Sequence, residues 1–184
     1  MIYFTSDLHF CHDKPFLYEP RGFTNVEDMN KAIVKNWNSV VKFEDHVYIL
    51  GDLMLKDNDK GLDLVLSLNG HLHIILGNHD TAAREDLYKY IPSVEEVVWA
   101  KQIKWNGYTF FLSHYPTLTA NGPAKPDLKY NVINLYGHTH QKTNFWNDCP
   151  YNYHVGLDSH NCTPVSAEQV IADIQEQIDK LNNN

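Results

Sequence analysis

The stretch Ile74-Ile75-Leu76-Gly77-Asn78-His79-Asp80 decides how this chain folds. Its apolar residues complete a run that predicts a buried strand over residues 71–76. A glycine, an amide, an imidazole and a carboxylate follow directly. Three polar side chains at the tip of a buried strand are costly unless something there binds them. The stretch therefore predicts that this strand ends at a binding site.

The same arrangement, an apolar run followed by polar side chains, occurs four more times along the chain. Open α/β sheets bind ligands beyond the carboxyl ends of their strands, so five such ends can converge on one site. Asp7 and His9 would point to the same side if their backbone stays extended. The other blocks are Gly51-Asp52, Gly77-Asn78-His79-Asp80, Ser113-His114 and Gly137-His138-Thr139-His140. Together they predict a metal centre.

The periodicity of the apolar residues outlines the rest of the fold. Helical spacing predicts helices over about 25–41, 59–68 and 82–90, and a last helix capped by Ser166. A capping box over 24–27 would start the first helix, and Asp80 or Thr81 would cap the third. Loops are expected over 10–24 and 115–131. The expected strands cover 1–6, 46–50, 71–76, 94–98, 102–105, 108–113, 132–136 and 151–157.

The order of these elements predicts an α/β protein with two sheets. Strands and helices alternate up to about residue 90, which is typical of right-handed βαβ crossovers. From residue 94 onward the pattern is one of strands, with a hairpin turn at Asn106-Gly107. We therefore expect two sheets with helices outside them. A length of 184 residues favours one domain over 1–184.

The composition limits which classes of partner and which cellular compartment we expect for this protein. The net charge is −8, and the only arginines are Arg21 and Arg84, with no basic run. Binding to long nucleic acid is therefore disfavoured, because it depends on basic side chains that neutralise phosphates. Three cysteines without a Cys-x-x-Cys spacing, no secretion signal and no membrane-spanning segment predict a reduced, cytoplasmic protein. The sequence does not indicate an oligomeric state.

The donor types indicate which cations the centre would take. Carboxylate, imidazole and amide ligands without thiolate suit Mn²⁺, Fe²⁺, Zn²⁺ or Ni²⁺. Seven side chains are too many for one ion that must also hold a substrate, and they are the right number for two ions that share a carboxylate. The seven are Asp7, His9, Asp52, Asn78, His114, His138 and His140.

These blocks, in this order, resemble the calcineurin-like metallophosphoesterase family. Val155-Gly156-Leu157-Asp158 and Pro164-Val165-Ser166 further resemble a small, single-domain bacterial or phage branch of it. The resemblance implies a four-layer α/β/β/α sandwich of two mixed sheets flanked by helices. It also implies one metal on Asp7, His9, Asp52 and His140. The other metal would take Asp52, Asn78, His114 and His138, so that Asp52 bridges the pair.

In a centre of this kind, two cations lower the pKa of a bridging water, and the resulting hydroxide attacks phosphorus in line. The leaving oxygen needs a proton, and His79 is the only histidine of these blocks that is not assigned to a metal. Asp80 would hold the second ring nitrogen of His79, unless it serves only as a helix cap. His12 and Arg21 are candidate phosphate contacts, with solvated loop residues as the alternative. His46, His71 and His73 are expected to be structural.

The predicted function is hydrolysis of a phosphomonoester or phosphodiester of a small, nucleotide-like substrate. A nuclease of the same fold is the first alternative, and it would need a basic or aromatic track toward the metals. The second alternative is a binding module that keeps the fold without catalysis. Such a module would show eroded ligand positions, whereas all seven are present here.

Overall fold

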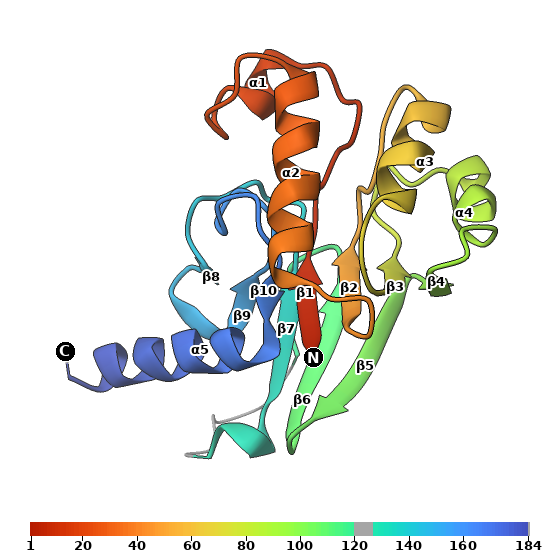
Figure 1. Cartoon of the computed structure of the whole chain (residues 1–184). Coiled ribbons are helices and arrows are strands. Elements are labelled where there is room, and N and C mark those ends of the chain that lie inside the picture. Colours follow the sequence, from red (N-terminus) through yellow and green to blue (C-terminus); the bar gives the residue numbers. More distant parts are fainter. Residues whose placement is uncertain (120–126, 184) are drawn as a thin grey trace.

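The computed structural model describes residues 1–119 and 127–183 and places ten strands there in two mixed sheets (Figure 1). The strand order of the first sheet is β10-β1-β2-β3-β4, with only β10 antiparallel to its neighbour. Its strands are β1 (Ile2–Thr5), β2 (His46–Leu50), β3 (His71–Ile75), β4 (Val94–Val98) and β10 (Val165–Ser166).

The second sheet has the order β5-β6-β7-β9-β8, with β6, β7 and β9 parallel. The hairpin between β5 and β6 turns at Asn106 and Gly107, as expected, with φ values of +47° and +85°. Its strands are β5 (Ala100–Trp105), β6 (Tyr108–Ser113), β7 (Val132–Tyr136), β8 (Phe145–Trp146) and β9 (Cys149–His154). The predicted architecture of two mixed sheets with helices is therefore confirmed.

Helices α2 (Val26–Val40), α3 (Asn58–Leu66) and α4 (Ala82–Tyr88) cover one face of the first sheet (Figure 1). The apolar stripe of α2 is fully buried there, including Ile33 and Trp37. Asn25 caps this helix, since its side chain accepts a hydrogen bond from the amide of Asp28. The capping box expected to begin at residue 24 is thus wrong by one position.

The last helix, α5 (Ala167–Asn182), contacts both sheets and extends away from them beside β9 and β10 (Figure 1). It contacts β9, β10 and β1, and it buries Val170 and Ile174 in the core between the sheets. Ser166 caps it as predicted, by accepting from the amide of Gln169. Among the described residues, no helix is long and apolar enough to cross a membrane.

Two expected segments differ from the structure, and a third lies partly outside the described residues. The segment 10–24 contains a short helix, α1 (Pro15–Tyr18), because Pro15 occupies the first helical turn without losing a hydrogen bond. The last long strand covers 149–154 instead of 151–157. Residues 120–126 of the expected loop 115–131 lie outside the described residues, and a 3₁₀ turn, η1 (Leu128–Tyr130), follows them.

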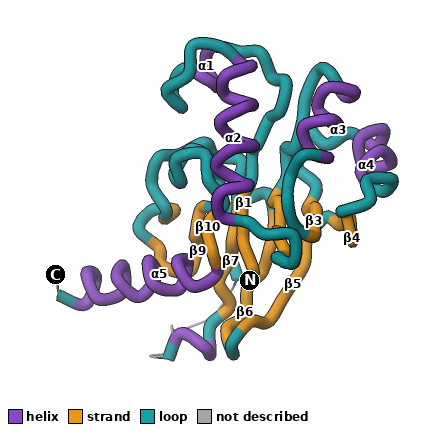
Figure 2. The backbone as a smooth tube through the Cα atoms, viewed as in Figure 1, coloured by secondary structure: helices purple, strands orange, loops and turns teal. Residues whose placement is uncertain are grey.

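The parallel strands bring their carboxyl ends to one edge of the sandwich. The strands run into loops there, as Figure 2 shows. Backbone hydrogen bonds link these loops in pairs, from the amide of Asp7 to the carbonyl of Gly51, and from the amide of Gly137 to that of His114. Each sheet thereby holds its own loops together at this edge.

Candidate metal centre

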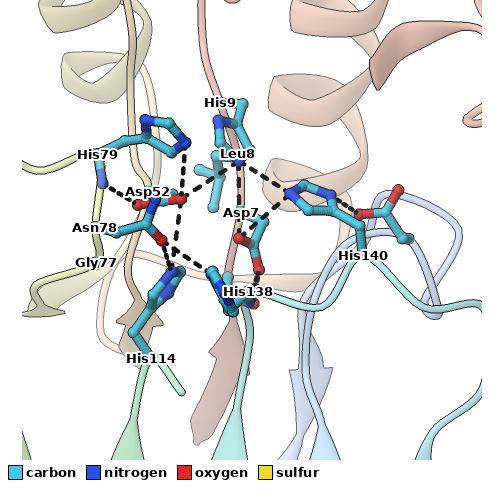
Figure 3. Close-up of polar contacts among 12 residues, drawn as sticks. Asp7, Leu8, His9, Asp52, Gly77, Asn78, His79, His114, His138 and His140 are labelled. Carbon is cyan, nitrogen blue, oxygen red and sulfur yellow. Dashed lines mark hydrogen bonds and ion pairs between the residues drawn. The ribbon is translucent and has the colours of Figure 1, made fainter. Parts of the chain in front are cut away.

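The seven predicted ligand residues meet where the two sheets adjoin, and Figure 3 shows their side chains pointing toward one another. They arrive from four loops and from the end of β6. They come from both sheets and from positions up to 133 residues apart, since the first is Asp7 and the last is His140. The structure therefore brings together every member of the predicted set.

The backbone at Asp7 and His9 is not extended, contrary to the expectation for these two residues, and three other ligand positions share the conformation found there. Asp7 and His9 have φ values of +57° and +50°, and Asp52 has +57°. His138 and His140 have +67° and +48°. Left-handed backbone is uncommon for residues other than glycine and is concentrated at functional sites, where the surrounding structure must maintain it. Here the paired loops maintain it and turn the side chains inward.

One half of the centre contains Asp7, His9 and His140. The Nε2 atoms of the two imidazoles lie 3.2 Å apart. Each of them lies 3.7 Å from Oδ1 of Asp7. Burial lowers the pKa of His9 to about 4, which keeps its ring neutral, as a metal ligand must be.

The other half contains Asn78, His114 and His138. Oδ1 of Asn78 lies 2.9 Å from Nε2 of His114 and 2.9 Å from Nδ1 of His138. Nδ1 of His114 is 2.8 Å from the carbonyl oxygen of Leu50, so this nitrogen carries the proton and Nε2 faces the centre with its lone pair. The amide oxygen and two nitrogens thus converge on one point.

Asp52 lies between the halves. Its Oδ2 atom is 3.6 Å from Nε2 of His9 and 3.6 Å from Nε2 of His114. Its Oδ1 accepts a hydrogen bond of 2.9 Å from the amide of His79, which fixes the carboxylate plane. Burial raises the pKa of Asp52 because there is little water to solvate the charge. Cations on either side of Asp52 would favour the ionised form of its carboxyl group.

The hydrogen bonding of Asp7 indicates that these side chains suit a cation. Oδ1 of Asp7 is buried and has no hydrogen-bond partner among the described residues, although its other oxygen accepts from Ser6 and from the amide of His138. Burial opposes ionisation of Asp7, but the neighbouring imidazoles hold its pKa below the usual range. A buried carboxylate oxygen left free and facing two imidazole nitrogens suits a divalent cation.

Asp80 does not have the role expected of it. Its oxygens accept hydrogen bonds from the amides of Asp52 and Gly77, at 2.8 Å each, and from the hydroxyl of Tyr88 at 2.7 Å. Neither the predicted contact with the ring of His79 nor a side-chain cap on α4 is found among the described residues. Asp80 instead ties the loop after β2 to the loop after β3.

Arg21 is not placed to contact phosphate. Its guanidinium is fully buried and forms a two-pronged pair with Asp158, with distances of 3.1 Å and 2.8 Å. It also donates to the carbonyl of Asp7 at 2.8 Å. Oδ2 of Asp158 in turn lies 2.9 Å from Nδ1 of His140. The predicted substrate contact is therefore a support for two predicted ligands.

Asp158 is the residue of this site whose role sequence reasoning missed. A carboxylate that binds the far nitrogen of a ligand histidine fixes the orientation of the ring and raises its basicity. The signal was present in the sequence, because Val155-Gly156-Leu157-Asp158 repeats the pattern of an apolar residue, a glycine and a carboxylate after a strand.

A cavity of about 460 Å³ opens over the centre. His79 lines it with a side chain that is 44% exposed, and its Nε2 lies 3.9 Å from Oδ2 of Asp52. His12 also lines it, and its ring lies 5.3 Å from that of His9. Lys14 and Phe16 from the start of α1 complete the outer wall. His79 and His12 thus both line the cavity over the candidate centre.

Comparisons with known proteins show which family this chain is similar to. The calcineurin-like phosphoesterase superfamily domain matches residues 1–156. An uncharacterised protein of Methanocaldococcus jannaschii is 34% identical over 183 residues, covering 95% of this chain and 92% of its own. The gene 66 protein of Mycobacterium phage L5 is 31% identical over 160 residues, covering 75% and 76%.

Among solved structures, a protein of unknown function from Aquifex aeolicus has the same fold. It superposes with a TM-score of 0.70 at 26% identity, and the match covers 94% of this chain and 98% of that one. The family match covers every residue of the candidate centre, since the last of the seven is His140. The chain belongs to the calcineurin-like phosphoesterase superfamily.

Proposed function

We propose that the protein hydrolyses phosphomonoester or phosphodiester bonds with the help of two bound divalent cations. The observation that carries this proposal is the position of Asp52, whose Oδ2 lies 3.6 Å from a nitrogen of each half of the centre. One cation would be held by Asp7, His9, Asp52 and His140. The other would be held by Asp52, Asn78, His114 and His138.

A pair of such cations supplies Lewis-acid polarisation of a phosphoryl group and a nucleophile at neutral pH. The chain's own residues do the rest. Asp52, fixed by the amide of His79 and by the loop that Asp80 secures, sets the spacing of the two halves. Asp158 orients His140, and the carbonyl of Leu50 orients His114. This rigidity holds the reacting groups in one geometry, which is the main requirement of phosphoryl transfer.

His79 is the proposed proton donor to the leaving oxygen. Its ring faces the cavity while its backbone is fixed, because its amide donates to Asp52 and its carbonyl accepts from Arg84 at 2.6 Å. A fixed backbone with a partly exposed ring allows the imidazole to reach a bound substrate and to exchange its proton with solvent.

The cavity supports a small substrate. Its volume of about 460 Å³ is that of a site for a nucleotide-sized molecule. Lys14 and His12 are among the cationic or titratable groups that line it, and they offer contacts for phosphate. Both arginines are engaged elsewhere, Arg21 with Asp158 and Arg84 with the carbonyl of His79. This arrangement favours a small phosphorylated substrate over a polymer.

Hydrolysis assays with two synthetic esters test the proposal. We expect the metal-depleted protein, reconstituted with Mn²⁺, to hydrolyse p-nitrophenyl phosphate or bis-p-nitrophenyl phosphate. Asp52→Asn should abolish turnover, because both halves lose their shared charge. A matched control is Asp63→Asn, an exposed position on α3, which should leave turnover unchanged. Failure of the loaded protein to hydrolyse either ester or any small nucleotide would refute the proposal.

A further inference from the structure

A second group of metal-ligand side chains lies at the other end of the first sheet. We call it the His–Glu cluster, and it consists of His46, His71, His73, Glu95 and Glu96. His46 and His71 are the first residues of β2 and β3, whereas the candidate centre follows the last residues of these strands. The cluster is therefore separate from that centre and has no part in the proposed function.

The sheet register brings these residues together. His46 and His71 are paired across β2 and β3, and His73 follows His71 on the same face of the strand. A bulge interrupts the pairing of β3 with β4, because Leu72 pairs with Val94 while His73 pairs with Glu96. Glu95 is the additional residue of this bulge. Bulges re-aim side chains, and this one brings a carboxylate to the imidazoles.

Three ligand atoms face a common point. Nδ1 of His46 lies 2.9 Å from Nε2 of His73. Oε2 of Glu95 lies 3.6 Å from Nε2 of His73 and 3.9 Å from Nδ1 of His46. Ligand atoms of a tetrahedral zinc ion are separated by about 3.3 Å, given bonds of roughly 2.0–2.2 Å. Movements of a few tenths of an ångström would reach that spacing.

The surroundings of His73 are those of a ligand histidine. Its Nδ1 lies 2.7 Å from Oε1 of Glu96, so Nδ1 carries the proton and Nε2 presents its lone pair to His46 and Glu95. Glu96 is held in turn by the ammonium of Lys101. The ring of His73 stacks on Tyr48 with 4.4 Å between centroids, and burial lowers its pKa, which favours the neutral form.

The remaining two ligand candidates are accessible. The side chains of His46 and Glu95 are 44% and 43% exposed, so a cation can enter from solvent and keep a water as its fourth ligand. His71 orients the carboxylate, because its Nδ1 lies 2.8 Å from Oε1 of Glu95. The site therefore combines one buried ligand of fixed orientation with two ligands that are accessible to solvent.

We infer that His46, His73 and Glu95 form a site for one further divalent cation of the zinc type. The cation would connect the amino ends of β2 and β3 to the bulge of β4. Because it would bind only the folded arrangement of these strands, it would stabilise this edge of the sheet.

Zinc stoichiometry tests the inference. The metal-depleted full chain is equilibrated with ZnCl₂, desalted, and its zinc measured by mass spectrometry per folded chain, with folding verified by thermal unfolding in chelator. We expect His46→Gln and Glu95→Gln each to retain one zinc ion fewer than the wild type, with ester hydrolysis unchanged. Glu44→Gln is the control, an exposed carboxylate two positions before β2, and should keep the wild-type content.

Equal zinc contents in the wild type, His46→Gln and Glu95→Gln would overturn the inference. Loss of zinc in His71→Gln but not in His46→Gln would overturn the assigned ligands. The outcome is distinguishable from failure of the proposed function. Asp52→Asn, which disrupts the candidate centre, should still retain the zinc ion of the His–Glu cluster.

Discussion

Replacement of Asp158 by Asn tests the buried support beneath His140. The guanidinium of Arg21 is fully buried, and Asp158 is 4% exposed, so the variant leaves an uncompensated charge in the interior. Removal of one partner from such a pair costs about 3–5 kcal/mol of unfolding free energy. The amide oxygen of Asn can still accept one of the two hydrogen bonds, which places the expected loss at about 3 kcal/mol.

Urea unfolding in the presence of chelator measures this loss without a contribution from bound metal. With a slope of about 2 kcal/mol per M, the midpoint should fall by about 1.5 M. Metal affinity should fall by roughly 10–100-fold as well, because His140 loses the carboxylate that orients it. Asp63→Asn is the matched control and should unfold as the wild type does. A midpoint for Asp158→Asn equal to that of the wild type would refute the reasoning.

Three further predictions follow from single residues. Gly137→Ala should lose metal, activity and about 1–3 kcal/mol of unfolding free energy, because the added Cβ would lie 2.6 Å from Cβ of Ser6. Elemental analysis measures the metal and urea unfolding the stability, and a normal metal content would contradict the prediction. His79→Gln should lower kcat by about 10²–10⁴-fold with both cations retained, measured by ester hydrolysis and elemental analysis; metal loss would make His79 a ligand. Burial lowers the pKa of His154 to about 4 from 6.5, so the unfolded chain binds the proton more tightly, and stability should fall as pH decreases from 6.5 to 4. Across that pH window, the free energy of unfolding measured with urea should fall by about 3 kcal/mol less for His154→Gln than for the wild type. An equal fall in both proteins would contradict the prediction.

Much of the fold could be predicted because its signals are local. The strands at 46–50, 94–98, 108–113 and 132–136 have the predicted bounds, since each is a short apolar or alternating run between turn residues. The strands β8 and β10 were not predicted. Each has two residues and exists because a neighbouring strand pairs with it, as when Tyr3 pairs with Ser166. A segment this short carries no periodicity of its own.

The composition of the site could be predicted to a similar extent. Polar residues at strand ends identified the seven that converge, because parallel strands place those ends at one edge. The roles of Arg21 and Asp80 could not be predicted in this way. Arg21 pairs with Asp158, which is 137 positions away, and the carboxylate of Asp80 turns inward to the loop after β2. Such contacts depend on how the loops fold over one another.

The left-handed backbone at the candidate ligands had no sequence signal either. Glycine would have indicated it, but Asp7, His9 and Asp52 adopt positive φ without being glycine. The energy for this strain comes from tertiary contacts, including the hydrogen bonds that pair the loop after β1 with the loop after β2. These contacts become visible only when both loops are placed together.

Anomalous diffraction at the manganese edge, from crystals grown with Mn²⁺, tests the central claim most directly. We expect two peaks, one on each side of the Asp52 carboxylate, the first beside His9 and His140 and the second beside His114. A map without a peak at Asp52, or with a single peak that leaves His114 without a cation, would contradict the dinuclear centre.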